Sequence, residues 1–228
     1  CLAISYYTCR YTLKVINYIL PIHPITQSTS RLECIKLMMD YLCFELPVLR
    51  NGTLYGTVQL DECIHSEEET IETLVDGGFA SVGGNSHLFD VLHIFNESKA
   101  NVCCVLNDEL QWIGIITKTA AIEALGQSLT VNQGGAILLV EMASYQYSSS
   151  ELARLIEGEG AQLLGLWLNN VAESGRIQAS LKLNIKNAER IINSLQRHGY
   201  ETIASFGDED YKENVENRFQ SLMKYIDL

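Results

Sequence analysis

The sequence predicts a mixed α/β protein, in which an internal repeat is followed by a separate C-terminal α+β module. Segment 32–51 recurs as segment 88–107, which indicates two copies of one folding unit. After Gly134 the pattern changes to a β-α-β-β-α-β order. Of the 228 residues, 47% are hydrophobic and 19% are charged, a balance that allows more than one packed core.

Charge and cysteine usage exclude several classes of protein. There are 16 Lys and Arg against 28 Asp and Glu, and a net charge of −12 does not suit a general nucleic-acid binder. No apolar run approaches the ~20 residues of a membrane helix. The seven cysteines include no C-x-x-C pair, so we expect reduced core thiols, a cytoplasmic protein and no metal site. Residues 1–14 fit no part of the repeat and are interpreted as an extension of unknown structure.

In chain order, the first copy is expected to contain an extended segment, a helix, two strands and a closing helix. Ser30 and Glu33 have capping-box spacing at the start of the helix, and Asn51-Gly52 is a strong hairpin signal between the strands. The acidic stretch Glu67–Asp76 is expected to be a solvated helix face that connects the copies. The predicted segments are 16–25 (extended), Leu32–Leu42 (helix), and Leu46–Leu49 and Gly56–Leu60 (strands).

The second copy repeats these parts. Ser86 is expected to cap its first helix, and its hairpin turn is two residues longer because the offset between copies rises from 56 to 58. The predicted segments are Ala80–Val82 (extended), Leu88–Phe95 (helix), and Val102–Leu106 and Gly114–Thr117 (strands). The aligned pairs are Leu32 with Leu88, Leu46 with Val102, Val48 with Cys104, and Gly56 with Gly114.

This twofold β-α-β-β-α unit resembles the CBS domain. The likeness rests on the helix, the Leu46-Pro47-Val48 strand, the hairpin and the glycine followed by apolar residues. It implies that residues 15–126 form one disc, often called a Bateman module, with halves 15–66 and 77–126. The resemblance also implies an adenine nucleotide such as AMP or ATP, or S-adenosylmethionine, as regulatory ligand, and a homodimer.

The family's nucleotide motif is glycine, two apolar residues, Ser or Thr, two variable residues and Asp. In the first copy Gln59 replaces the hydroxyl, and Glu62 takes the carboxylate position, with Asp61 one residue early. The second copy keeps Thr117 and adds Lys118, but has alanine where the carboxylate belongs. The resemblance therefore implies these candidate ligand residues: Gly114, Ile116, Thr117, Lys118, Gln59, Asp61, Glu62, Leu46 and Pro47.

Two interpretations of the disc remain open. An altered site in the second copy would place Thr117 and Lys118 on a phosphate at a helix start. A degenerate disc would serve only as a scaffold. Between residues 51 and 150, Lys99 and Lys118 are the only Lys or Arg, against 13 Asp and Glu. The negative electrostatic field of this excess of carboxylates would repel a polyphosphate.

The C-terminal module, residues 134–206, has the ferredoxin-like order β-α-β-β-α-β. Ser148 is expected to cap its first helix, and Arg176–Ile185 alternates as a half-buried strand. Length and position resemble an ACT domain, which implies an amino-acid ligand near the first strand–helix loop, with Ser144, Tyr145 and Tyr147 as candidates. That loop lacks the family's glycines, so a dimerising sheet without ligand is the alternative. The other predicted segments are Ala136–Met142, Gln162–Asn169, a helix after Asn187, and Tyr200–Phe206.

Residues 207–228 are predicted to form a last helix. Its apolar residues recur three or four positions apart and give one stripe, which is typical of a helix that docks on its own protein or across a dimer. The stripe consists of Tyr211, Val215, Phe219, Leu222 and Ile226.

The two-module order resembles the bacterial acetoin-utilisation protein B group. It implies a non-catalytic, cytoplasmic regulator that senses a small ligand and acts on a protein partner. The alternative is a ligand-free dimerisation or interaction scaffold. The sequence has no Gly-rich phosphate loop, nucleophile elbow or H-E-x-x-H motif, so an enzyme is not expected. Glu67–Glu69 are interpreted as a solvated face and not as a metal site.

Overall fold

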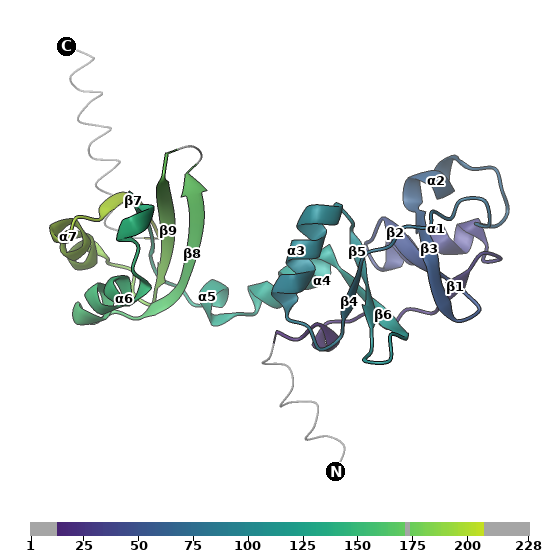
Figure 1. Ribbon diagram of the computed structural model, residues 1–228, viewed down its shortest axis with the longest axis horizontal. Helices are drawn as coiled ribbons and strands as arrows, with labels where there is room; N and C mark the ends of the chain where they lie inside the picture. Colours follow the sequence, from purple (N-terminus) through teal and green to yellow (C-terminus); the bar gives the residue numbers. More distant parts are fainter. Residues whose placement is uncertain (1–12, 172–173, 208–228) are drawn as a thin grey trace, which may run out of the picture. The chain divides into compact units, whose positions relative to one another are not determined.

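The computed structural model describes residues 13–171 and 174–207, in two compact units that divide between Gly126 and Gln127 (Figure 1). Residues 1–12 and 208–228 lie outside the described residues, and with them most of the expected N-terminal extension and the expected C-terminal helix. No described helix is both long and apolar enough to cross a bilayer.

The first unit contains the predicted β-α-β-β-α order twice. In each copy a short strand pairs in parallel with the middle strand, which pairs antiparallel with the third through the hairpin. The first copy consists of β1 (Ile25–Thr26), α1 (Arg31–Asp40), β2 (Glu45–Arg50), β3 (Thr53–Gln59) and α2 (Leu60–His65). The second consists of β4 (Ser81–Gly83), α3 (Leu88–Ser98), β5 (Val102–Leu106), β6 (Trp112–Thr117) and α4 (Lys118–Gly126).

The structure corrects the alignment of the copies by one residue. The helices α1 and α3 begin at Arg31 and Leu88, and the strands β2 and β5 begin at Glu45 and Val102, so these parts lie 57 residues apart. After the hairpin the offset is 58, as predicted, because α2 and α4 begin at Leu60 and Lys118. The second hairpin turn is therefore longer by one residue, not by two.

The predicted pairing of Leu32 with Leu88 is wrong for this reason. Leu88 is fully buried, whereas Leu32 is 67% exposed. A shift of one residue turns a helix by about 100°, so the wrong offset matches a core position with a solvent position. The structural counterpart of Leu32 is Phe89, which is also exposed.

Other differences lie at the helix ends. Leu42 falls outside α1, has a left-handed backbone (φ 51°) and is exposed. The predicted Ser86 cap is wrong: His87 is the N-cap of α3, its Nδ1 accepts from Phe89 N–H at 3.2 Å, and the Asp90 carboxylate accepts from His87 N–H.

Ser30 occupies the N-cap of α1, but its side chain makes no cap bond to any described residue. The acidic connector over 67–76 contains no helix, in contrast to the expectation. The extended segment expected over 16–25 is mostly irregular: a 3₁₀ turn, η1 (Val15–Asn17), overlaps its start, and only β1 is strand.

The described cysteines are buried, free thiols in the two cores of this unit, apart from Cys104, which is buried between strands. Burial raises the pKa of the Cys103 and Cys104 thiols to about 12, so almost no reactive thiolate forms at neutral pH. These side chains act as small hydrophobic residues. The set is Cys34, Cys43, Cys63, Cys103 and Cys104.

The second unit has a four-stranded antiparallel sheet with strand order β10-β7-β9-β8, the ferredoxin-like arrangement. Two helices cover one face, and the Ser148 hydroxyl caps the first of them by accepting from Glu151 N–H at 3.2 Å, as predicted. The elements are β7 (Ile137–Ala143), α6 (Ser149–Gly158), β8 (Leu163–Val171), β9 (Arg176–Leu183), α7 (Glu189–Arg197) and β10 (Glu201–Phe206).

A short helix, α5 (Leu129–Asn132), precedes this sheet and was not predicted. Thr130 Oγ1 donates to Leu164 O at 2.8 Å and holds α5 beside β8. A Cβ on Gly165 would overlap the Thr130 methyl group, so glycine is required for this contact.

Candidate functional site

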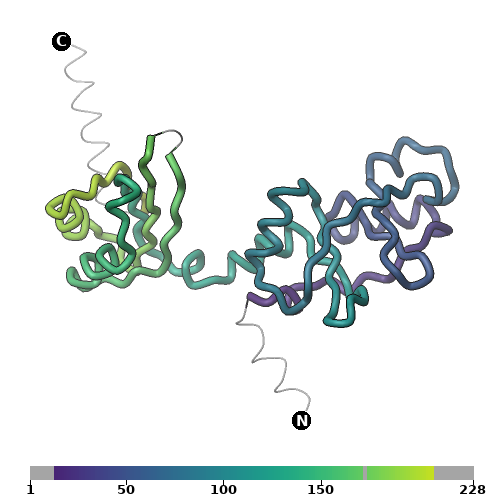
Figure 2. Tube along the Cα trace, in the orientation of Figure 1, coloured from purple at the N-terminus to yellow at the C-terminus, as the bar shows by residue number. Residues whose placement is uncertain are grey.

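At two glycines of the first unit, the backbone of one repeat passes close to a strand of the other repeat. We call the residues before β1 (13–24) and before β4 (72–80) the leader segments. Each leader crosses the third strand of the other repeat; Figure 2 shows the first one, in purple, passing along the second repeat before it reaches the first. At the crossings, a Cβ on Gly114 would lie 2.9 Å from Leu20 O, and one on Gly56 would overlap Asp76 O.

Each crossing is held by a reciprocal pair of backbone hydrogen bonds. Leu20 N–H donates to Ile115 O at 2.7 Å, and Ile115 N–H returns a bond of 3.2 Å. Thr57 and Asp76 exchange the same pair at 2.8 and 2.9 Å. The motif glycines therefore have a structural role, which is to let the leaders approach, whatever binds nearby.

The second-repeat turn holds the side chains best suited to a phosphate. Thr117 is only 2% exposed, and its hydroxyl oxygen accepts from Ala120 N–H at 3.1 Å, which caps α4. A hydroxyl that accepts one hydrogen bond keeps a proton that it can donate in another. Lys118 begins α4, and its Nζ lies 5.6 Å from the centroid of the Phe95 ring. A hydroxyl, a cation and a helix N-terminus thus meet at one turn.

The equivalent first-repeat turn is used differently. The Gln59 amide donates to Glu45 Oε2 at 2.9 Å, and Glu45 Oε1 accepts from the backbone N–H groups of Asn101 and Val102 in the other repeat. Asn101 O in turn accepts from Lys118 N–H at 3.1 Å. A chain of hydrogen bonds therefore runs from one motif turn to the other through Glu45.

Glu45 is the residue of this candidate site that sequence reasoning missed. Its carboxylate is buried, at 6% exposed, at the junction of the repeats. The available signal was the mismatch between the copies, because a glutamate heads β2 where valine heads β5. A buried anion at this position lowers the attraction of the junction for a phosphate.

Asp61 and Glu62 lie in the first turn of α2, next to Gln59. Asp61 is exposed and lies 3.2 Å from His65 Nδ1. Glu62 lines an open hollow of about 620 Å³ that Asp76 also lines, so this side of the junction is acidic. The arrangement suits a cationic group better than a polyphosphate. The remaining lining residues are His65, Ser66, Thr73, Leu74 and Val75.

The remaining candidates of the first unit belong to the sheets. Leu46 and Ile116 are fully buried, and their apolar side chains belong to the two cores. Pro47 is buried next to Leu46 and pairs with Thr57 on β3. The structure therefore brings Gly114, Thr117 and Lys118 together, and puts Leu46 and Ile116 in the interior.

In the second unit, the first strand–helix loop is a 3₁₀ turn, η2 (Ser144–Gln146). Both the backbone N–H and the hydroxyl of Ser144 donate to Gly175 O, at 3.1 and 2.8 Å. Tyr145 is 89% exposed, whereas Tyr147 packs against the core. Of the three candidates, Ser144 and Tyr145 are exposed, and the Ser144 hydroxyl is already bonded to Gly175 O.

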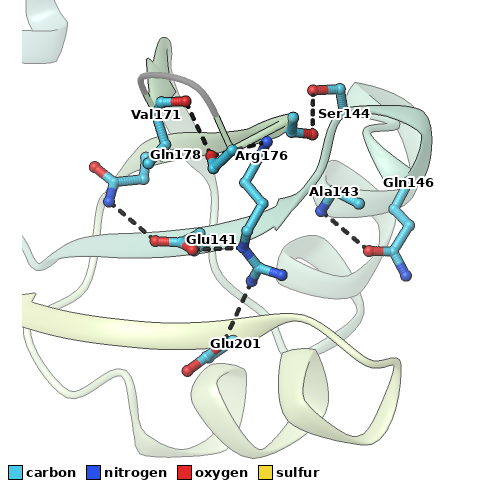
Figure 3. A network of polar contacts seen from close by, with 10 residues as sticks. Glu141, Ala143, Ser144, Gln146, Val171, Arg176, Gln178 and Glu201 are labelled. Atoms are coloured by element: carbon cyan, nitrogen blue, oxygen red, sulfur yellow. Dashed lines mark hydrogen bonds and ion pairs between the residues drawn. The ribbon is translucent and has the colours of Figure 1, made fainter.

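An ionic network lies beside this loop (Figure 3). Arg176 bridges the carboxylates of Glu141 and Glu201, and Gln178 Nε2 donates to Glu141 Oε2 at 3.1 Å. The hydrogen bonds from Gln178 and then Arg176 lower the pKa of Glu141. Since two carboxylates already surround Arg176, a ligand carboxylate would have to displace one of them.

Within the described ranges, no three His, Cys, Asp or Glu side chains are placed to hold a metal ion.

No protein-family model and no curated protein matches the chain. Among solved structures, CBSX2 in complex with AMP is 21% identical, with a TM-score of 0.43 over 50% of this chain and 96% of that chain. A CBS domain pair/ACT domain protein from Thermotoga maritima is 22% identical (TM-score 0.42, 49% and 95% covered). The CBS domain of a bacterial CNNM/CorC family Mg²⁺ transporter, in complex with ATP, is 16% identical (TM-score 0.42, 54% and 93% covered).

Proposed function

We propose that the first unit is a CBS pair that binds an adenine nucleotide, or S-adenosylmethionine, at the second-repeat turn of a non-catalytic regulatory protein. The observation that carries the proposal is the buried Thr117 hydroxyl at the N-terminus of α4, with Lys118 next to it. Binding is predicted to be weak, because the second copy lacks the carboxylate that would bind the ribose and because Glu45 is a buried carboxylate. The charge of Glu45 favours a ligand with few phosphate charges, such as AMP, over ATP.

The test is titration calorimetry of the full chain with AMP, ATP and S-adenosylmethionine. We expect AMP to bind, and Thr117→Val and Lys118→Met each to weaken binding tenfold or more. The matched controls are Thr119→Val, two residues after Thr117 and exposed, and Lys99→Met, which removes the same charge at another exposed position. Both should bind as the parent does. Absence of binding at millimolar concentration, or equal binding by all variants, refutes the nucleotide site.

The second candidate function is a ligand-free interaction scaffold. It is favoured by the Gln59 side chain, which is already bonded to Glu45, and by Ala120 at the carboxylate position of the motif. This candidate requires a partner protein that binds with the same affinity in the presence and absence of nucleotide.

The second unit is proposed to be an ACT-like domain, as in the acetoin-utilisation protein B group, and the chain to act as a cytoplasmic homodimer. An amino acid or related metabolite would bind near Ser144 and Tyr145 by displacing a carboxylate from Arg176. A thermal-shift panel of amino acids tests the site, and Tyr145→Ala should reduce any shift. Sedimentation velocity tests the dimer.

A further inference from the structure

One peptide group at the start of β5 is hydrogen-bonded at both of its ends. The C=O of Asn101 and the N–H of Val102 belong to this same peptide group. Its N–H donates to Glu45 Oε1 at 2.9 Å, and its C=O accepts from Lys118 N–H at 3.1 Å. The peptide group therefore connects a buried carboxylate of the first repeat to the first residue of α4 in the second.

The bond from Lys118 N–H matters for a phosphate, because an anion at a helix N-terminus binds to the N–H groups of the first turn. The N–H of Lys118 is already bonded to Asn101 O. The N–H of Ala120 is bonded to the Thr117 hydroxyl. A phosphate at this turn would gain a donor if Lys118 N–H turned away from Asn101 O. A stronger bond to Asn101 O therefore means a weaker phosphate site.

The charge of Glu45 strengthens the bond that occupies Lys118 N–H. An ionised acceptor polarises the peptide group that donates to it, and the carbonyl at the other end of that group becomes a stronger acceptor. Glu45 is only 6% exposed, so water screens this effect little. Glu45 thus acts on the second-repeat turn through the peptide group as well as through its electrostatic field.

Gln59 shares the charge of Glu45 from the side of the first-repeat turn. Its amide nitrogen Nε2 donates to Glu45 Oε2 at 2.9 Å. A second donor on the carboxylate reduces the negative charge that polarises the Asn101–Val102 peptide group. Gln59 also occupies the hydroxyl position of the motif in the first copy, so a group bound at the first-repeat turn would compete with Glu45 for this amide.

We infer that Glu45 is a positioning residue that couples the two motif turns negatively. We call the hydrogen-bond chain from Gln59 through Glu45 and the Asn101–Val102 peptide group to Lys118 the relay. The inference rests on the proposed nucleotide site and concerns its regulation. A ligand that draws the Gln59 amide away from Glu45 strengthens the bond to Lys118 N–H and lowers the phosphate affinity of the second-repeat turn. By linkage, a phosphate at the second-repeat turn disfavours that ligand by the same factor.

Backbone NMR of the full chain without ligand tests the relay itself. A stronger hydrogen bond moves an amide proton to lower field. In Glu45→Gln, which keeps an acceptor oxygen but removes the charge, we expect the Lys118 amide proton to move to higher field. In Gln59→Leu, which leaves the whole charge on the peptide group, we expect it to move to lower field. The matched controls are Glu97→Gln, at an exposed position of α3, and Gln27→Leu, which removes an amide of the first repeat outside the relay. Both should leave it unchanged.

Calorimetry with AMP, and with adenosine as the probe that lacks a phosphate, tests the effect on binding. We expect Glu45→Gln to bind AMP about threefold more tightly than the parent, and Gln59→Leu to bind it about threefold more weakly. Gln59→Leu is the decisive variant, because it leaves the net charge of the protein unchanged. The affinity for adenosine should be the same in all of these proteins, since the relay acts on the phosphate.

A Lys118 amide proton that stays in place, or that moves in the same direction in both variants, overturns the inference. So does a Gln59→Leu variant that binds AMP as tightly as the parent does. If the parent itself does not bind AMP, the proposed nucleotide site fails, and the NMR shifts, which need no ligand, decide whether the relay exists. Circular dichroism of each variant establishes that the protein is folded before these comparisons are made.

Discussion

Glu45 Oε1 lies 2.9 Å from the backbone nitrogen of Val102, and Val102 is the residue that occupies the position of Glu45 in the other repeat. The first residues of the two middle strands, β2 and β5, are therefore in contact. The Glu45 carboxylate accepts the backbone N–H groups at the start of β5. Gln59 accompanies this contact by donating to the second carboxylate oxygen.

Replacing Glu45 by alanine is expected to destabilise the first unit by about 2–3 kcal/mol, because the N–H groups of Asn101 and Val102 and the Gln59 amide lose their acceptor. Glu45→Gln keeps an acceptor oxygen and should cost about 1 kcal/mol. Urea unfolding measures both. Glu62→Ala, at an exposed position in the same region, is the control and should change the free energy of unfolding by less than about 0.5 kcal/mol. Equal losses for Glu45→Ala and Glu62→Ala would contradict the bridging role.

Gly56→Ala is expected to cost about 3 kcal/mol, because the new Cβ overlaps the backbone carbonyl of Asp76 and forces the leader away from β3. The matched control is Gly77→Ala in the same leader, where a Cβ meets no described atom within 4 Å. It should be neutral or stabilise by up to about 1 kcal/mol through the unfolded state. Thermal unfolding distinguishes them, and a tolerated Gly56→Ala would refute the tight crossing.

The element order of the repeat was predictable from the sequence, but the residue-by-residue alignment of the two copies was not. The sequence of α1 has apolar residues on most of its sides. Residue type alone therefore does not decide whether Leu32 or Cys34 faces the core. The structure buries Cys34 and exposes Leu32. Strand β9 posed no such problem, because a period of two assigns each residue to one face, and Ile177, Ala179 and Leu181 are buried as expected.

The candidate site was predictable only in part for a related reason. Thr117 and Lys118 lie next to each other in sequence, so a motif locates them together. Glu45 acts on residues more than 50 positions away, and no local pattern reports such a contact. The same holds for Arg176, whose partners Glu141 and Glu201 lie on two other strands.

Two hydroxyls on β10 are expected to reduce stability. Thr202 Oγ1 and Ser205 Oγ are buried, and neither has a hydrogen-bond partner among the described residues. Thr202→Val keeps the shape and removes the unpaired group, so it should stabilise the second unit by about 1 kcal/mol. Thr119→Val, at an exposed position, is the control and should change little. A destabilised Thr202→Val in urea unfolding would show that the hydroxyl is bonded.

The Arg176 network predicts how the stability of the second unit depends on pH. Hydrogen bonds from Gln178 and Arg176 place the pKa of Glu141 below its ordinary value in the folded state. Above the ordinary value Glu141 is ionised in both states and the network stabilises the fold. As the pH falls, the unfolded chain takes up its proton first, so this stability is lost between about pH 5 and the lower folded pKa.

The measurement is urea unfolding followed by Trp167 fluorescence in the Trp112→Phe background, from pH 7 down to pH 3.5. We expect the parent to lose stability more steeply below pH 5 than its Gln178→Leu and Arg176→Met variants, which lack the donors that lower the pKa of Glu141. Arg190→Met, at an exposed position of α7, removes one positive charge without touching the network and should keep the slope of the parent. If Arg176→Met keeps that slope as well, the network does not set the acid sensitivity of this unit, since the lowered pKa of Glu141 requires its two donors.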